Sequence, residues 1–125
     1  MINGAHVLLY SKNPEADRAF LRDVFGFAWV DAHDGWLIFA LPPAEVAVHP
    51  GDFAQVHAGH ELLGATLYLM CDNLEETMRS LGENKVPFTE ISQEAWGLRT
   101  TMRLPSGGEI GLYQPRHASP LKPGS

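Results

Sequence analysis

The stretch Tyr10-Ser-Lys-Asn-Pro-Glu15 returns 60 positions further on as Met70-Cys-Asp-Asn-Leu-Glu75. Both copies close an apolar segment and open a helix, because Asn is a favourable N-cap and Pro is a favourable first helical residue. Towards the end of each half, Glu45–Pro50 matches Glu109–Pro115. Self-similarity of this kind predicts a duplicated unit, and each half is expected to run strand, helix, strand, strand, strand.

The repeat divides the chain of 125 residues into two halves of a single domain. A chain of this length has room for one core but not for two independent ones. We expect a first βαβββ module in residues 1–50, a linker in 51–63, a second module in 64–115 and a tail in 116–125.

Each half should contain one amphipathic helix that covers a sheet. Gly26 is expected to end the first helix in the left-handed conformation common at helix ends, and Gly82 is expected to close the second helix. The apolar residues fall on one stripe of each helix. They are Ala16, Phe20 and Val24 in the first helix, and Leu74, Met78 and Leu81 in the second.

The composition excludes several classes of partner. The net charge is −6 and the 9 Lys and Arg residues form no run, so no basic surface for nucleic acid or an anionic membrane is expected. Cys71 is the single cysteine, which excludes an internal disulfide. The N-terminus has no export signal, and no apolar run approaches the ~20 residues that span a bilayer. We expect a cytoplasmic protein.

Alternation along the first and last strands of each half separates two faces. One face is wholly aliphatic and should lie under the helices: Val7, Leu9, Val46, Val48, Leu67, Leu69, Ile110 and Leu112. The other face is mixed: His6, Leu8, Tyr10, Glu45, Ala47, His49, Thr66, Tyr68, Met70, Glu109, Gly111 and Tyr113. Such a mixture is typical of a lined cavity. We take its members other than Glu45 and Glu109 as the predicted ligand pocket; a surface covered by a dimer partner is the alternative.

The doubled βαβββ plan, the helix starts after Tyr10 and Met70, and the closing Leu104-Pro-Ser-Gly-Gly-Glu-Ile-Gly-Leu-Tyr113 resemble the glyoxalase / bleomycin-resistance / extradiol-dioxygenase (vicinal oxygen chelate) superfamily. The resemblance covers about residues 2–115. It implies an α+β fold of two tandem βαβββ modules, which form a cupped, curved mixed sheet with helices on the outer face. It also implies a homodimer, and in many members a divalent metal inside the cup.

Carried over residue by residue, the metal-ligand positions of the resemblance fall on His6, Ala47, Thr66 and Gly111. Only His6 has a side chain that commonly binds Zn, Fe, Mn or Ni, and such ions need about three protein ligands. His49, Glu45 and Glu109 could substitute, but neighbours on one strand face are roughly 6.6 Å apart, which is far beyond a metal bond of ~2 Å. The sequence therefore predicts no metal or other cofactor.

Several other residues have two interpretations. Trp36 and Trp96 occupy matching places in the halves, so they are either aromatic walls of a ligand site or duplicated core residues. Cys71 is expected to be a buried, inert thiol. His57 and His60 are expected to be solvent-exposed rather than a metal pair.

Two functions from different classes follow. The first is a metal-independent small-molecule binding protein with a degenerate metal site, whose ligand contacts include Tyr68 and Tyr113 and whose ligand is aromatic. The second is an enzyme: a metal-dependent lyase, isomerase or extradiol-type dioxygenase rebuilt around His6, or a metal-free enzyme with His6 as general base. A domain whose mixed face is only a dimer surface is a third possibility.

Overall fold

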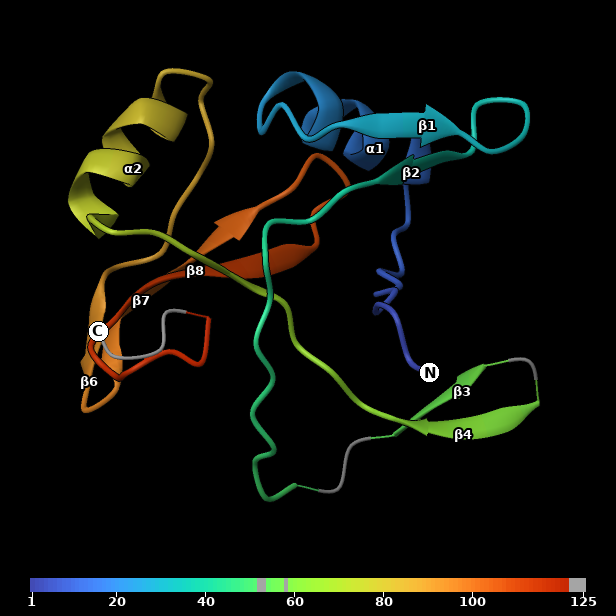
Figure 1. The fold of residues 1–125 in the computed structure, drawn as a ribbon. Coiled ribbons are helices and arrows are strands. Elements are labelled where there is room, and N and C mark those ends of the chain that lie inside the picture. Colours follow the sequence, from blue (N-terminus) through green and yellow to red (C-terminus); the bar gives the residue numbers. More distant parts are fainter. Residues whose placement is uncertain (52–53, 58, 122–125) are drawn as a thin grey trace.

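The computed structural model describes residues 1–51, 54–57 and 59–121, with the side chains of 54–57 excepted. Within these residues, no helix is long and apolar enough to cross a membrane. The elements in chain order are α1 (Pro14–Asp23), β1 (Trp29–Asp31), β2 (Leu37–Phe39), β3 (Ala54–His57), β4 (His60–Leu63), β5 (Tyr68–Met70), α2 (Leu74–Gly82), β6 (Ser92–Glu94), β7 (Gly97–Arg103) and β8 (Glu109–Pro115). Figure 1 shows their arrangement.

Both helices start at the predicted caps. The side chain of Asn13 accepts a hydrogen bond from the Ala16 N–H (3.3 Å), and that of Asn73 accepts one from the Glu76 N–H (3.0 Å). Each bond satisfies an N–H that has no partner within the first helical turn. After α1 the chain reverses at Gly26, whose φ of 71° is the left-handed conformation expected there.

The second half forms the predicted βαβββ module. Its sheet has the order β5-β8-β7-β6, with β5 parallel to β8 and the remaining pairs antiparallel. The β5-to-β8 pairing is parallel because α2, β6 and β7 all intervene, and such a connection is long enough to return the chain in the same direction. The β7–β8 hairpin turns through Gly107, which has a φ of 93°.

The first half is more open than the sequence predicts. Its middle strands β1 and β2 pair antiparallel, but among the described residues 1–10 and 40–51 form no strand. A strand forms only where a neighbouring edge accepts its hydrogen bonds, and the two expected outer strands do not pair with each other as β5 and β8 do. Within the predicted linker 51–63, β3 and β4 form an antiparallel hairpin that stands apart from the larger sheet (Figure 1).

One hydrophobic core holds the second sheet and both helices together. Its buried members come from α2, from β7 and β8, and from the segments beside β7: Leu74, Val86, Met102, Leu104, Ile110 and Leu112. From the first half, Phe20, Val24 and Phe25 pack against it. The chain therefore folds around the second module, and α1 is attached to it by an apolar stripe.

The predicted aliphatic face is buried in one half and exposed in the other. Ile110 and Leu112 are buried beneath α2. Their counterparts Val46 and Val48 are 90% and 93% exposed. In a single chain, nothing among the described residues covers this part of the first half.

Candidate functional site

The ring of Tyr68 on β5 lies directly against Gly111 on β8. The two residues are register partners, and a Cβ added to Gly111 would overlap three carbons of the Tyr68 ring. That Cβ would point to the face opposite Ile110 and Leu112, which are buried under α2. On the open face of the sheet, Tyr68 therefore fills the space that a side chain at position 111 would need.

Two further aromatic side chains join Tyr68 on this face. Tyr113 follows Gly111 by two positions on β8, and Trp96 lies in the turn between β6 and β7. Their ring centroids are 5.6 Å (Tyr68 to Tyr113), 6.2 Å (Tyr68 to Trp96) and 5.3 Å (Trp96 to Tyr113) apart, all edge to face. Edge-to-face contacts place the positive rim of one ring on the negative face of the next. We call Tyr68, Trp96 and Tyr113 the aromatic cluster.

Polar groups from distant parts of the chain meet at the hydroxyl of Tyr113. It donates to Glu45 Oε1 at 3.2 Å and lies 3.1 Å from His117 Nε2. The other carboxylate oxygen of Glu45 accepts from Ser119 at 2.8 Å. Burial, followed by the hydrogen bond to Glu45, raises the pKa of the Tyr113 phenol. The phenol is thus a hydrogen-bond donor that ties the 40–51 segment and the tail to the aromatic cluster.

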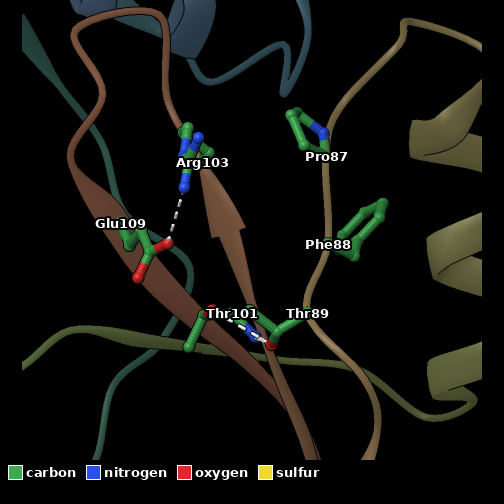
Figure 2. A pocket seen from close by; sticks show the side chains of 6 residues that line it. All are labelled: Pro87, Phe88, Thr89, Thr101, Arg103 and Glu109. Atoms are coloured by element: carbon green, nitrogen blue, oxygen red, sulfur yellow. Dashed lines mark hydrogen bonds and ion pairs between the residues drawn. The ribbon is translucent and has the colours of Figure 1, made fainter.

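A pocket opens on the same face, near the turn of the β7–β8 hairpin (Figure 2). Its volume is about 140 Å³, and its lining residues are Pro87, Phe88, Thr89, Thr101, Arg103 and Glu109. Thr101 is the register partner of Gly111, and Arg103 is the partner of Glu109. The pocket is therefore adjacent to the Tyr68 ring, one step further along the strands.

The sequence-predicted pocket residues fall into two groups. Tyr68, Met70, Gly111 and Tyr113 are brought together on β5 and β8. The remaining members are exposed on the first half or before β5: His6, Leu8, Tyr10, Ala47, His49 and Thr66. Of the proposed substitute metal ligands, Glu45 bonds Tyr113 and Glu109 pairs with Arg103.

The donor set does not fit a metal of the kind the resemblance implies. Across the described residues, no three or more His, Cys, Asp or Glu side chains are grouped so that they could hold a metal ion. His6 and Thr66 are exposed, and the Tyr68 ring covers position 111. A stable site for Zn, Fe, Mn or Ni needs about three protein ligands.

The structure separates the two matched tryptophans. Trp96 belongs to the aromatic cluster, whereas Trp36 is 62% exposed. The guanidinium carbon of Arg18 lies over the Trp36 ring, 4.5 Å from the ring centroid. Cys71 is half-buried against the core, and burial raises the pKa of its thiol. His60 is exposed, and the side chain of His57 lies outside the described part of the chain.

Sequence reasoning missed the pocket residues Thr89, Thr101 and Arg103. It sorted only the first and last strands of each half by their alternation. The same two-residue period applied to β7 separates Arg99, Thr101 and Arg103 from the buried Thr100 and Met102. That signal would have placed the basic and hydroxyl side chains on the open face.

Comparison with known proteins gives structural neighbours only. No protein-family model matches the chain, and no curated protein does. A lactoylglutathione lyase from Agrobacterium tumefaciens superposes with a TM-score of 0.62 at 16% identity, over 90% of this chain and 92% of that one. TnmS3, an antibiotic binding protein from Streptomyces sp. CB03234, superposes with a TM-score of 0.55 at 20% identity, over 92% and 99%. The chain has the glyoxalase / bleomycin-resistance fold.

A member of the glyoxalase / bleomycin resistance protein / dioxygenase superfamily from Sphaerobacter thermophilus is also similar. Its TM-score is 0.50 at 18% identity, over 90% of this chain and 98% of that chain. These likenesses confirm the predicted α+β fold. Because the glyoxalase / bleomycin-resistance fold carries both enzymes and binding proteins, the function must be argued from the side chains of the open face.

Proposed function

We propose that the chain is a metal-independent binding protein for small aromatic molecules. The observation that carries the proposal is the Tyr68 ring, which stands over Gly111 where the resemblance places a metal ligand. An aromatic surface thus takes the place of a coordination site. The fold of TnmS3, described as an antibiotic binding protein, supports a binding function for this scaffold.

The aromatic cluster has the properties that such a site needs. Its side chains are only partly buried, so ring surface stays accessible. Favourable ring pairs contribute roughly 0.5–1.5 kcal/mol beyond the area they bury. Trp96 and Tyr68 supply ring faces and edges, and the carboxylate of Glu45 lies at the rim through its bond to Tyr113.

The two tryptophans provide a matched test. We expect 1-naphthamide and related naphthyl compounds to raise the thermal unfolding temperature of the wild type and to bind in calorimetric titration. Trp96→Ala should weaken binding on the order of tenfold, since it removes one ring contact and the apolar area that accompanies it. Trp36→Ala should bind as the wild type does. Equal losses in both variants, or none in Trp96→Ala, would overturn the proposal.

A metal-dependent lyase, isomerase or dioxygenase built around His6 is the competing possibility. No grouping of ligating side chains among the described residues favours it. Elemental analysis after exposure to Zn, Fe(II), Mn and Ni tests this independently of activity. About one metal per wild-type chain, lost in His6→Ala, would replace the binding-protein proposal with the enzyme.

We also infer that the chain works in the cytoplasm, as its sequence predicts. A separate inference is that the chain forms a homodimer. The support is the exposure of Val7, Leu9, Val46 and Val48, which are aliphatic side chains of the kind that the second half buries. Exposed aliphatic surface of this kind often marks a contact with another protein chain. Analytical ultracentrifugation should show a dimer that Val46→Lys with Val48→Lys converts to monomer, while Glu61→Lys does not. A wild type that is monomeric throughout would refute this inference.

A further inference from the structure

The pocket beside Tyr68 is lined by no member of the aromatic cluster. Its lining carries a cationic group, an anionic group and hydroxyl groups. The lining includes the guanidinium of Arg103, the carboxylate of Glu109, and the side chains of Thr89, Thr101 and Pro87. Figure 2 shows Phe88 turned towards the side of α2, away from these groups. Phe88 packs against the core, so it is a structural wall rather than a ligand contact.

Arg103 and Glu109 are incompletely paired with each other. Arg103 Nη2 lies 3.7 Å from Glu109 Oε1, and the two side chains are 61% and 46% exposed. A charge-assisted N–H···O bond is usually about 2.7–2.9 Å long. Among the described residues no other group bonds these two side chains, so Arg103 keeps free N–H donors and Glu109 keeps free acceptor sites beside them.

The threonine hydroxyls are largely used within the protein. Thr89 Oγ1 accepts from the Thr101 N–H at 2.9 Å and from the Thr101 hydroxyl at 3.1 Å. The Thr101 hydroxyl gives its single proton to Thr89, so Thr101 Oγ1 adds an acceptor and no free donor to the pocket lining. The donors available to a ligand thus come from Arg103, and the acceptors come from Glu109 and Thr101.

The net charge of the pocket is balanced, which selects the kind of group it can hold. A carboxylate would gain Arg103 but would face Glu109, and an ammonium would face Arg103. A group that accepts and donates side by side without net charge satisfies both. A primary carboxamide does so, because its carbonyl accepts from Arg103 while its N–H donates to Glu109.

The pocket and the aromatic cluster are close enough to share one molecule. Thr101 is the register partner of Gly111, whose open face carries the Tyr68 ring. Glu109 lies two residues from Gly111 on β8, a separation of about 6.6 Å along a strand. A bicyclic aromatic molecule with one substituent covers this span.

We propose that Arg103 and Glu109 form a polar subsite for an uncharged donor–acceptor head group, such as a carboxamide, on a ligand whose ring contacts Tyr68. This inference rests on the proposed function and assigns the ligand its second recognition element. Arg103 donates to the head group carbonyl, and Glu109 accepts from the head group N–H.

Three probes with one ring system test the subsite by calorimetric titration: 1-naphthamide, 1-naphthoate and 1-naphthylmethylammonium. The wild type should bind the amide on the order of tenfold more tightly than either charged probe, because each of those faces a like charge. Arg103→Met should weaken the amide about tenfold and strengthen the ammonium. Glu109→Gln should strengthen the carboxylate. Arg79→Met, on the exposed side of α2, should leave all three affinities unchanged.

The outcomes separate the subsite from the aromatic site. If the three probes bind equally, depend on Trp96, and ignore Arg103→Met and Glu109→Gln, the subsite is refuted and the proposed function stands. If no probe binds the wild type at millimolar concentration, both proposals are refuted. Opposite responses of the ammonium and the carboxylate to the two variants would support the subsite, because a structural role of either residue would move all three probes together.

Discussion

The side chain of Tyr68 and the backbone of Gly111 occupy complementary space. No residue larger than Gly can stand at position 111 while the Tyr68 ring keeps its place, because the added Cβ would overlap the ring. The two residues are register partners on parallel strands, so neither strand can shift without breaking the sheet hydrogen bonds. The aromatic character of the open face therefore depends on Gly111.

Gly111→Ala should force the Tyr68 ring out of the cluster. Overpacking of this kind costs typically about 1–3 kcal/mol of stability. Chemical denaturation should show that loss, and naphthyl binding should weaken with it. The double variant Gly111→Ala with Tyr68→Ala should recover part of the stability relative to the sum of the single changes, because the clash is then absent. Strict additivity would show that the two side chains do not compete for space.

The bond between Glu45 and Tyr113 should hold the 40–51 segment near the cluster. Removing one partner of such a hydrogen bond costs about 1 kcal/mol, and more where a charged group is involved. Glu45→Ala should therefore increase amide hydrogen exchange in residues 40–51 and in the tail, since Ser119 also bonds Glu45. Tyr113→Phe should give a smaller increase in the same residues. Glu61→Ala, an exposed carboxylate, is the control that should change neither segment.

Asp17 should connect α1 to the β7–β8 hairpin. It is only 8% exposed, and its carboxylate accepts from the Ser106 N–H at 3.0 Å and from the Ser11 hydroxyl at 2.6 Å. Asp17→Ala leaves the Ser106 N–H without this partner, so we expect a loss of about 1–3 kcal/mol in unfolding free energy. Glu15→Ala on the exposed side of the same helix should cost far less. A loss of equal size in both variants would argue against the connection.

Glu94 should make stability depend on pH in the acid range. Hydrogen bonds from Ser92 (2.8 Å) and then from Arg99 (3.1 Å) lower the pKa of the Glu94 carboxyl below its ordinary value of 4.5. A lowered folded-state pKa means that the contribution is present above pH 4.5 and is lost as the pH falls from there through the folded-state value. As the pH is lowered from 7 to 3, the denaturation midpoint should fall less steeply in Glu94→Gln than in the wild type. Parallel slopes would contradict this assignment.

The second half could be predicted closely because its local and global signals agree. The cap at Asn73 and the alternation that buries Ile110 and Leu112 specify the elements of one βαβββ module. The resemblance added that the strands form a curved mixed sheet with helices on its outer face. Neither the sequence nor the resemblance indicated which side chain fills the space beside Gly111, since a glycine in a sequence indicates only that space is needed there. Alternation placed Tyr68 and Tyr113 on one face. The matching positions of Trp36 and Trp96 left two interpretations open, and only the structure shows that Trp96 joins the tyrosines from a turn.

The first half shows the limit of local pattern. Val46 and Val48 alternate as a buried strand would, yet both are exposed in the single chain. Alternation records which side of a strand is apolar, and it does not record which surface covers that side. The same holds for Glu45, which alternation assigned to the mixed face but whose partner Tyr113 lies far away in the chain.

The amino-acid sequence by itself determined the helix starts at Asn13 and Asn73, the βαβββ order and hydrophobic face of the second half, and the absence of metal-ligating side chains at positions 47, 66 and 111. These features follow from residues that lie close together in the sequence, because backbone geometry fixes the spacing of such residues. Only the tertiary structure decided that Tyr68 covers Gly111, that Trp96 and not Trp36 joins the ring cluster, and that Arg103 meets Glu109 beside a pocket. Those contacts depend on strand register and on the direction of each side chain in space, which arise when segments distant in the chain are packed together.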